Sequence, residues 1–422
     1  MYPFRPAYRD QTFLAQTRPF AKKPIGVEPL KEHRLPVHTP ADDFLRDAWD
    51  KVAWLPGHSR FQAAGVHRVD PQKRDSTPIY PEISTMRVDL IIQPHLPADE
   101  FAALGELAES YGISGVWVSN HLDGRDPFVN FVPLAQRTQK LQMGPTALSP
   151  YEEHPIQMAK LLLTLNEVAG GRAHVAVGGG GGTIDSMGIK PKRIVRTVRE
   201  CIEILRLANA HERFVYDGEI FQAHGLNTSW AEAPPPMIYG AVCGEQMLRM
   251  AARYADGIMT SDFTAVRLRW ARKIIDPVLD KAGRDPTTFP LINFWACHIK
   301  ETHEAAMEEA RLYLMARATI WPPWVHDVVS DEEAAEVARH YPAFVRAYRR
   351  SSDIEGPPRE LVDKMVERGM TACAADEIDA QIDRLKEQRA AGATGVALCL
   401  YDDPAYAIRI IGERIVPALK GV

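Results

Sequence analysis

"RVDLIIQPHLPADEFAALGELAESYGISGVWVS", residues 87–119, contains the repeating unit from which the fold is built. Residues 87–93 form a short apolar run of the length typical of a buried strand. Residues 97–112 follow, with one apolar helical face made of Phe101, Leu104, Leu107 and Tyr111. A second apolar run occupies residues 115–119. The stretch therefore predicts a strand, a helix and a second strand.

The same alternation continues to the end of the chain. Six further apolar runs, each separated from the next by helical sequence, predict strands at 141–148, 173–177, 237–242, 257–260, 291–299 and 395–400. Strands that read as continuous apolar runs are buried on both faces, which is typical of a parallel sheet covered by helices. Eight such units predict an α/β fold, a (β/α)8 TIM barrel that spans residues 86–422.

Two insertions into the barrel are predicted, at about 183–232 and 301–394, because the chain is longer than eight units require. In the first, "FVYDGEIFQ" (214–222) has Asp-Gly between two β-prone triplets, which predicts a hairpin. In the second, "IWPPWVHDVV" (320–329) cannot be helix interior because of its two prolines. A large aromatic loop here is a candidate lid over the strand ends, with a dimer interface or plain packing as alternatives.

Residues 1–85 differ in composition from the barrel. They contain 11 prolines, against 21 in the remaining 337 residues, and show little periodicity. We expect an irregular N-terminal extension, a Pro-rich arm that either wraps over the barrel or a subunit interface, or covers the active site. One short helix is predicted within it, at 41–55.

The composition argues against several classes of protein. A net charge of -5 and an isoelectric point near 6.3 do not favour general binding to nucleic acid. No apolar stretch approaches the roughly 18 residues of a membrane span, and the polar N-terminus does not resemble a signal peptide, so we expect a cytoplasmic protein. The five cysteines are scattered without a CxxC pair, which predicts neither a disulfide framework nor a metal site.

The first candidate site is a run of glycines. In a barrel of this kind the active groups lie on the loops after the carboxyl ends of the strands. Directly after the predicted fourth strand come Gly178, Gly179, Gly180, Gly181, Gly182 and Thr183. A bare backbone lets a ligand lie close, and successive N–H groups can bind phosphate oxygens. A tight turn with positive φ is the alternative reading.

A Rossmann fold is rejected, because the glycines are expected to precede a loop and Pro191 rather than to open a helix. The helix that follows carries Arg193, Arg196 and Arg199, which we interpret as its solvated face.

Other strand ends carry polar residues. Asn120 and His121 follow the second strand, where a histidine can donate a proton to a bound ring near neutral pH. Cys243, Gly244 and Glu245 follow the fifth strand, where the N-terminus of a helix can hold an anion. Cys243 as a nucleophile is a weaker hypothesis, since no base is evident for it. Single polar residues at further rim positions are His154, His298 and Asp402.

Several segments, in this order, together resemble a known superfamily. They are "GPTALSPYEEHPIQMAKLLLTLNEVAGGRAHVAVGGGGG" (144–182), "TIDSMGIKPKRIVRTVRECIEILRL" (183–207), "PPPMIYGAVCGEQMLRMAARYADGIMT" (234–260) and "GATGVALCLYDD" (392–403). The chain resembles the bacterial-luciferase-like superfamily of flavin- and deazaflavin-dependent oxidoreductases, and within it the methylenetetrahydromethanopterin reductase branch. The resemblance covers residues 86–419 and none of the arm.

The resemblance implies a cofactor, either coenzyme F-420 (8-hydroxy-5-deazaflavin) or FMN. In the family its ring lies against a bulge in strand three that has a non-prolyl cis peptide bond, and the matching bond joins Thr146 to Ala147. The cofactor phosphate lies near segments that match Gly178 to Thr183 and Cys243 to Glu245. The resemblance also implies a homodimer, a small organic substrate and, for an FMN-dependent monooxygenase, a separate flavin reductase as partner.

Two positions depart from the pattern of the family's deazaflavin-dependent dehydrogenases. Those read Ser-Asp-His after strand two, whereas this chain has Asn120 before His121, and their acid after strand four aligns with Gly181. Neither an amide nor a glycine can transfer a proton, which argues against alcohol dehydrogenation by that mechanism. His121 remains as a proton donor or a cofactor contact.

The leading hypothesis is hydride transfer between a bound deazaflavin or flavin and a small organic substrate. A two-component FMN-dependent monooxygenase is the alternative, and the segment 183–193 favours the deazaflavin. Two other classes are a non-redox barrel enzyme, such as a lyase or an aldolase, and a non-catalytic flavin-binding protein. The former would normally show a strand-end lysine or paired carboxylates.

Overall fold

The computed structural model describes residues 85–421. The predicted arm and its short helix lie outside the described residues, apart from residue 85. Within the described part, no helix combines the length and the apolar character needed to cross a membrane.

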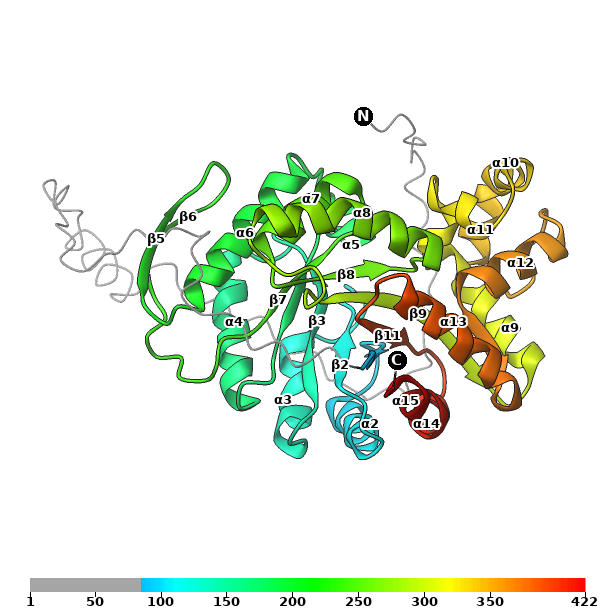
Figure 1. Ribbon diagram of the computed structural model, residues 1–422, viewed down its shortest axis with the longest axis horizontal. Helices are drawn as coiled ribbons and strands as arrows, with labels where there is room; N and C mark the ends of the chain where they lie inside the picture. Colours follow the sequence, from blue (N-terminus) through cyan, green and yellow to red (C-terminus); the bar gives the residue numbers. More distant parts are fainter. Residues whose placement is uncertain (1–84, 422) are drawn as a thin grey trace, which may run out of the picture. The chain divides into compact units, whose positions relative to one another are not determined.

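Eight parallel strands close into a barrel, which confirms the predicted fold (Figure 1). Neighbours run in the order β1-β2-β3-β4-β7-β8-β9-β11, and β11 pairs with β1 to close the ring. Each strand end lies within two residues of its prediction. The strands are β1 Arg87–Ile92, β2 Gly115–Val118, β3 Gln142–Leu148, β4 Val175–Val177, β7 Ile238–Ala241, β8 Gly257–Ser261, β9 Leu291–Lys300 and β11 Gly395–Cys399.

Helices surround the strands, and their ends follow local sequence signals. The Asp126 side chain accepts the N–H of Val129 at 3.0 Å, which caps α3, and Thr264 caps α8 in the same way. The outer helices are α2 Ala98–Ser110, α3 Pro127–Arg137, α4 Pro155–Val168, α6 Ile194–Ala208, α7 Glu245–Tyr254, α8 Ala265–Lys281, α13 Ile378–Ala390, α14 Pro404–Ile410 and α15 Val416–Leu419.

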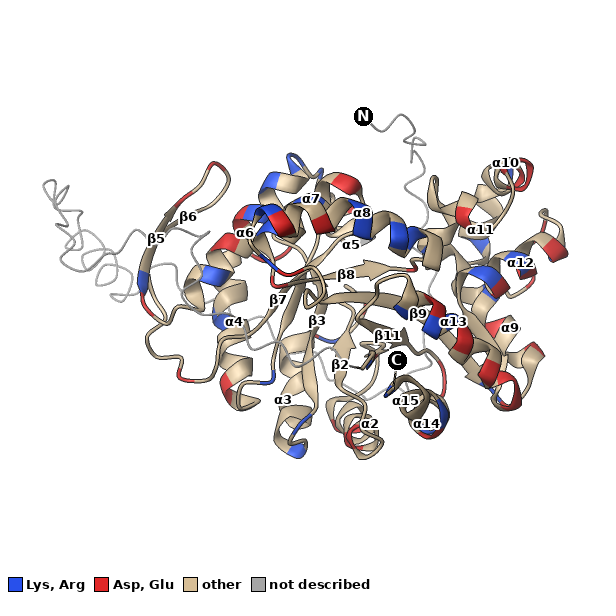
Figure 2. Cartoon of the chain, viewed as in Figure 1, with Lys and Arg blue, Asp and Glu red and all other residues tan. Residues whose placement is uncertain are grey.

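The strands separate two cores. Outward side chains such as Leu90 and Val116 pack against the helices, whereas inward ones such as Ile91 and Trp117 fill the barrel. Because both faces are buried, the barrel strands contain few charged residues, and most charged residues lie on the outer helices and the second insertion (Figure 2).

The second insertion packs over the carboxyl ends of the strands. Its side chains share one apolar cluster with the inward residues of the barrel. It contains α9 His303–Tyr313, α10 Asp331–Arg339, α11 Tyr341–Ala347, α12 Arg359–Gly369, β10 Thr371–Ala374 and short 3-10 turns. The strand β10, which the sequence reading missed, pairs in parallel with the end of β9. Residues 321–323 lie outside any helix, as their prolines require, and the Pro322–Pro323 bond is cis.

The first insertion contains the predicted hairpin, made of β5 Arg213–Asp217 and β6 Gln222–Asn227. Its turn is longer than the Asp-Gly pair that predicted it, because Asp217 pairs with Gln222 and residues 218–221 form the loop. The physical reason is Glu200 on α6, which is fully buried. Its carboxylate accepts the N–H groups of residues 219, 220 and 221 at 3.1, 2.8 and 3.0 Å.

Candidate functional site

Three of the predicted cofactor segments meet at the carboxyl ends of β3, β4 and β7. The Thr146–Ala147 peptide bond is cis, as the resemblance implied, and the pairing of β3 with β4 shifts register between Thr146 and Leu148. The Thr146 hydroxyl is buried and lies 3.1 Å from the Met259 sulfur inside the barrel. Gly178 donates its N–H to the Leu148 carbonyl at 2.9 Å, which ties the loop after β4 to this bulge.

Gly178 has to be a glycine for packing reasons. A Cβ atom at this position would lie 2.9 Å from the Ala241 carbonyl oxygen and 3.2 Å from the Ala147 Cβ atom. Gly180 has φ 93°, and a Cβ atom there would lie 2.5 Å from the Ile184 side chain. The tight-turn alternative therefore accounts for part of the glycine run. Around Gly181, which is exposed, a Cβ atom would meet nothing within 4 Å.

The expectation that these glycines precede a loop was wrong. They open a short helix, α5 Gly181–Ser186, which includes Gly182 and Thr183. The left-handed conformation of Gly180 starts this helix, and Ile184 anchors it in the core with 2% of its surface exposed. Glycine has a low intrinsic propensity for helix, and at the start of α5 tertiary packing overrides this propensity.

The end of β7 places Cys243, Gly244 and Glu245 at the start of α7. Gly244 offers no side-chain cap to the first N–H groups of this helix, and Glu245 forms an ion pair with Arg249 at 2.8 Å. An uncapped helix N-terminus suits an anion. Burial raises the pKa of Cys243 to about 12, which keeps the thiol protonated at neutral pH and argues against the nucleophile hypothesis.

Asn120 and His121 lie at the end of β2, next to the loop after β3. Asn120 donates to the Glu152 carboxylate at 2.7 Å, and burial raises the pKa of Glu152. His121 is exposed, yet desolvation by the surrounding protein lowers its pKa, against the opposing charge of Asp123 and together with the nearby cations, among them Arg349. His121 is therefore neutral at pH 7, and Glu152, which the sequence reading passed over, is an acid bound to the neighbouring Asn120.

His154, by contrast, has a structural role. Its Nδ1 atom accepts the N–H of Ile156 at 3.3 Å and caps α4.

A buried ion pair between Arg317 of the second insertion and Asp262 lies at the same ends of the strands. Arg317 is 7% exposed and lies 3.5 Å from the Asp262 carboxylate, with its guanidinium 5.1 Å from the centre of the Phe294 ring. Asp262, directly after β8, also accepts the N–H of Ala318 at 3.0 Å. The strand-end rule could have selected Asp262, whereas no signal in the sequence marks Arg317.

His298 belongs to a second buried group, on β9. Its Nδ1 atom lies 2.7 Å from the Glu309 carboxylate, which also binds Lys300 at 2.6 Å and the N–H of Asp402 at 3.0 Å. The imidazole stacks on the Tyr401 ring at 4.6 Å. His298 and Asp402, which were isolated signals in the sequence, thus come together through Glu309 of α9. Asp402 takes part through its backbone and not its carboxylate.

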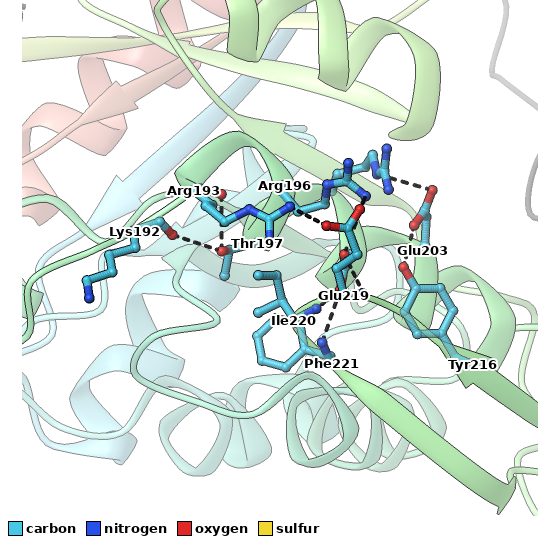
Figure 3. Close-up of polar contacts among 11 residues, drawn as sticks. Lys192, Arg193, Arg196, Thr197, Glu203, Tyr216, Glu219, Ile220 and Phe221 are labelled. Atoms are coloured by element: carbon cyan, nitrogen blue, oxygen red, sulfur yellow. Dashed lines mark hydrogen bonds and ion pairs between the residues drawn. The ribbon is translucent and has the colours of Figure 1, made fainter.

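The arginines after the glycine run pair with carboxylates of the chain itself (Figure 3). Arg193 and Arg196 both pair with Glu219 of the hairpin loop, Arg196 at 2.5 Å, and Arg199 pairs with Glu203 at 3.5 Å. The interpretation of these arginines as a merely solvated face was therefore incomplete, because the hairpin covers part of them.

An all-parallel barrel with a cis bond at the end of β3 and glycines after β4 is the arrangement expected of the bacterial-luciferase-like superfamily. The chain belongs to the luciferase-like monooxygenase family, whose model matches residues 76–394. It is 27% identical to the 5,10-methylenetetrahydromethanopterin reductase of Archaeoglobus fulgidus over 341 residues, which cover 79% of this chain and 100% of that protein. The reductase of that name from Methanolobus tindarius is 31% identical over 194 residues, 46% of this chain and 59% of that protein.

Solved structures share the fold. The coenzyme F-420-dependent tetrahydromethanopterin reductase of Methanopyrus kandleri matches with a TM-score of 0.68 at 21% identity, covering 80% of this chain and 100% of that one. The oxygenating constituent of 3,6-diketocamphane monooxygenase from Pseudomonas putida, in complex with FMN, matches with a TM-score of 0.55 at 18% identity, covering 79% and 98%.

These comparisons confirm the predicted superfamily and its reductase branch, and the protein is an oxidoreductase of the luciferase-like type. The two cofactors expected from the sequence are the two that these neighbouring structures name.

Proposed function

We propose that the protein binds coenzyme F-420 or FMN at the ends of β3, β4 and β7 and exchanges hydride with a small organic substrate. The observation that carries this proposal is the convergence of segments predicted separately: the loop after β4 lies so close to the ends of β3 and β7 that a Cβ atom at Gly178 would clash with the Ala241 carbonyl oxygen. Beside it lie the exposed Gly181 and the uncapped start of α7. These residues suit a flat ring and a phosphate.

When bound, the cofactor supplies the ring that gives or accepts hydride. The chain's part is to hold the ring against Thr146 and Ala147, to bind the phosphate through backbone N–H groups, and to exclude water by the packing of the second insertion. The similarity to a methylenetetrahydromethanopterin reductase, which covers 79% of this chain and 100% of that protein, supports coenzyme F-420 as the first choice.

Gly244 offers a direct test of the phosphate site. In Gly244→Asp the new carboxylate caps the first N–H groups of α7 and repels a phosphate, without harm to the helix, since aspartate is a favoured N-cap. Fluorescence titration of the purified protein with coenzyme F-420 and with FMN should show binding weakened by about tenfold or more. The matched control Gly244→Ala leaves the N–H groups free and should bind nearly as the unchanged protein does. Equal affinity of all three proteins would place the phosphate elsewhere.

Selective binding of FMN would instead favour the two-component monooxygenase, which several structural neighbours support by name. Oxygen consumption would then be measured with a partner flavin reductase. The family does not favour a non-redox barrel enzyme or a non-catalytic flavin-binding protein. A homodimer, a cytoplasmic location and the absence of nucleic-acid partners stay predictions.

A further inference from the structure

Arg317 of the second insertion is a buried arginine that leaves most of its hydrogen-bonding capacity unused. In the part of the chain that the structure describes, its guanidinium donates from Nη1 to the Asp262 carboxylate at 3.5 Å, and its Nε atom is buried without a partner. A guanidinium has five N–H donors, and folded proteins rarely leave buried donors unsatisfied. The free donors of Arg317 therefore suit an acceptor that comes from outside the chain.

Arg311, in the same insertion, shows the pairing of an arginine with a structural role. It is also buried, but its Nε donates to Asp363 at 2.6 Å and its Nη1 to Glu304 at 3.0 Å. Two carboxylates thus compensate one buried cation. Arg317 has only one carboxylate, at a longer distance, so its burial is not explained by the fold alone.

The free edge of the Arg317 guanidinium is the edge that binds carboxylates. Because Nη1 points to Asp262, the Nε and Nη2 atoms remain, and their N–H groups form the fork that holds a carboxylate by two parallel hydrogen bonds. The faces of the guanidinium are covered, since its centre lies 5.1 Å from the centre of the Phe294 ring and 6.0 Å from that of Tyr401. The two rings hold the cation and exclude water from it, which strengthens its attraction for an anion.

The Tyr401 hydroxyl is a second buried polar group without a hydrogen-bond partner among residues 85–421, apart from the weakly accepting Cys399 thiol beside it. Burial raises the pKa of Tyr401 well above its usual value, so the hydroxyl stays protonated at neutral pH. It can therefore donate to the same anion as Arg317.

His298 Nε2, a third unpartnered atom of this group, is not a donor. The pKa of Glu309 is lowered, because His298 and Lys300 together outweigh the effect of burial, so Glu309 is an ionised acceptor. Glu309 therefore takes the N–H of His298 Nδ1, and the lone pair of the ring lies on Nε2. An atom with a lone pair does not bind an anion, so we assign His298 no contact with the ligand.

Strand pairing connects Arg317 with the proposed cofactor site. The Phe294 ring, on which Arg317 packs, belongs to β9 and pairs with Ser261 of β8. The next strand, β7, ends at Ala241, whose carbonyl oxygen lies against Gly178. Ala241, Ser261 and Phe294 are each partly exposed. Solvent therefore reaches the strand ends both at the cofactor segments and at the ring beside Arg317.

The charges of this group favour a carboxylate over a phosphate. Asp262 already places one negative charge beside Arg317, and a carboxylate adds one more, whereas a phosphate adds nearly two. We propose that Arg317 and Tyr401 bind a carboxylate group of the substrate, and that the substrate of the hydride transfer is an organic carboxylate whose apolar part lies against Phe294. This inference rests on the proposed function, which supplies the redox step.

Isothermal titration calorimetry of the purified protein with acetate and benzoate tests the site, with benzamide as the neutral analogue and inorganic phosphate as the other anion. Both carboxylates should bind, and benzoate should bind about tenfold more tightly than benzamide or phosphate. Arg317→Gln should weaken benzoate binding by about tenfold or more. This variant should fold, because Asp262 still accepts the N–H of Ala318 and the Ser261 hydroxyl.

Two further variants separate binding from folding. Arg311→Gln is the matched control and should bind benzoate as the unchanged protein does, since Arg359 still pairs with Glu304 and Asp363 at 3.3 and 3.2 Å. Tyr401→Phe removes a hydroxyl without a partner, so its resistance to urea should not fall, whereas its affinity for benzoate should fall by about threefold or more.

The proposal is overturned if benzoate binds Arg317→Gln and Tyr401→Phe as tightly as the unchanged protein, or if neither carboxylate binds. Phosphate that binds more tightly than benzoate would overturn the carboxylate class.

The fluorescence titration with coenzyme F-420 and FMN distinguishes this proposal from the proposed function. Arg317→Gln should bind the cofactor with unchanged affinity, and a loss of about tenfold would assign the cation to the cofactor instead of the substrate. Absence of cofactor binding by the unchanged protein would overturn the proposed function itself, whatever the result with benzoate.

Discussion

His174 and His298 are buried at opposite ends of one barrel, and in each the Nε2 atom lacks a hydrogen-bond partner among the described residues. Their Nδ1 atoms differ. His174 Nδ1 accepts the N–H of Met237 at 3.1 Å, which puts the proton on Nε2, whereas Glu309 accepts from His298 Nδ1 and leaves a lone pair on Nε2. The same residue type is therefore a donor at one end and an acceptor at the other, and only the acceptor suits proton abstraction.

The ion pairs at the two ends of the barrel also differ, in the distance between their charged groups. At the amino-terminal end Arg87 lies 2.7 Å from Asp89, which is fully buried and also accepts the Trp117 indole N–H at 2.8 Å. At the rim the Arg317 to Asp262 contact is 3.5 Å. The tighter pair belongs to the closed amino-terminal end of the barrel, whereas the looser one lies at the ends of the strands where we propose the cofactor site.

The largest effect is expected from breaking the tighter ion pair, between Arg87 and Asp89. Asp89→Asn keeps an acceptor for Trp117 but leaves the Arg87 charge buried without compensation, so the free energy of unfolding should fall by about 3 kcal/mol. Asp262→Asn, the matched change at the rim, also takes the carboxylate from a buried arginine, but it weakens a longer contact of 3.5 Å and should therefore cost less than Asp89→Asn. Urea unfolding of both variants measures the difference. Equal losses would show that the two pairs have the same structural role.

A pH dependence sharpens the comparison of the histidines. Burial, with the charge of Arg87 adding, lowers the pKa of His174 to about 3. The unfolded chain takes up this proton near pH 6.5, so stability falls as the pH drops from that value toward 3. Between pH 6.5 and 5 the loss should be about 2 kcal/mol.

In His174→Gln the fall in stability that His174 causes between pH 6.5 and 5 should disappear. The free energy of unfolding, measured at each pH, tests this. The groups that face His174 include Arg87 and Tyr239. The pKa of Glu309 is lowered, so the stabilisation by its ionised carboxylate is lost only at lower pH. Glu309 therefore does not affect the change in stability between pH 6.5 and 5. An unchanged slope in the variant would contradict a neutral, buried His174.

The smallest effect is expected away from both ends, at the cations of α6. Arg196→Gln removes an ion pair whose Arg196 side chain is 33% exposed, so stability should change by less than about 1 kcal/mol. Cofactor affinity in the fluorescence titration should not change, because Glu219 already neutralises this charge. A tenfold loss of affinity would mean that the arginine reaches the phosphate.

The strand-end rule predicted that Gly178 and Cys243 lie at one rim, because parallel strands bring all their carboxyl ends together. The cis bond between Thr146 and Ala147 was expected from the family resemblance alone, and the structure contains it. Arg317 and Glu309 could not be found in this way. They lie on an insertion whose docking depends on an apolar cluster assembled from many segments, and nothing local marks which of its charges turn inward.

The sequence by itself determined the alternation of strand and helix, hence the barrel, since burial on both faces requires continuous apolar strands and short connections. It also determined the lack of a side chain at Gly178 and the backbone freedom at Gly180. Only the tertiary structure decided the tautomers of His174 and His298, because each depends on a partner at Nδ1 contributed by another element. Periodicity is a property of neighbours along the chain, whereas protonation depends on neighbours in space.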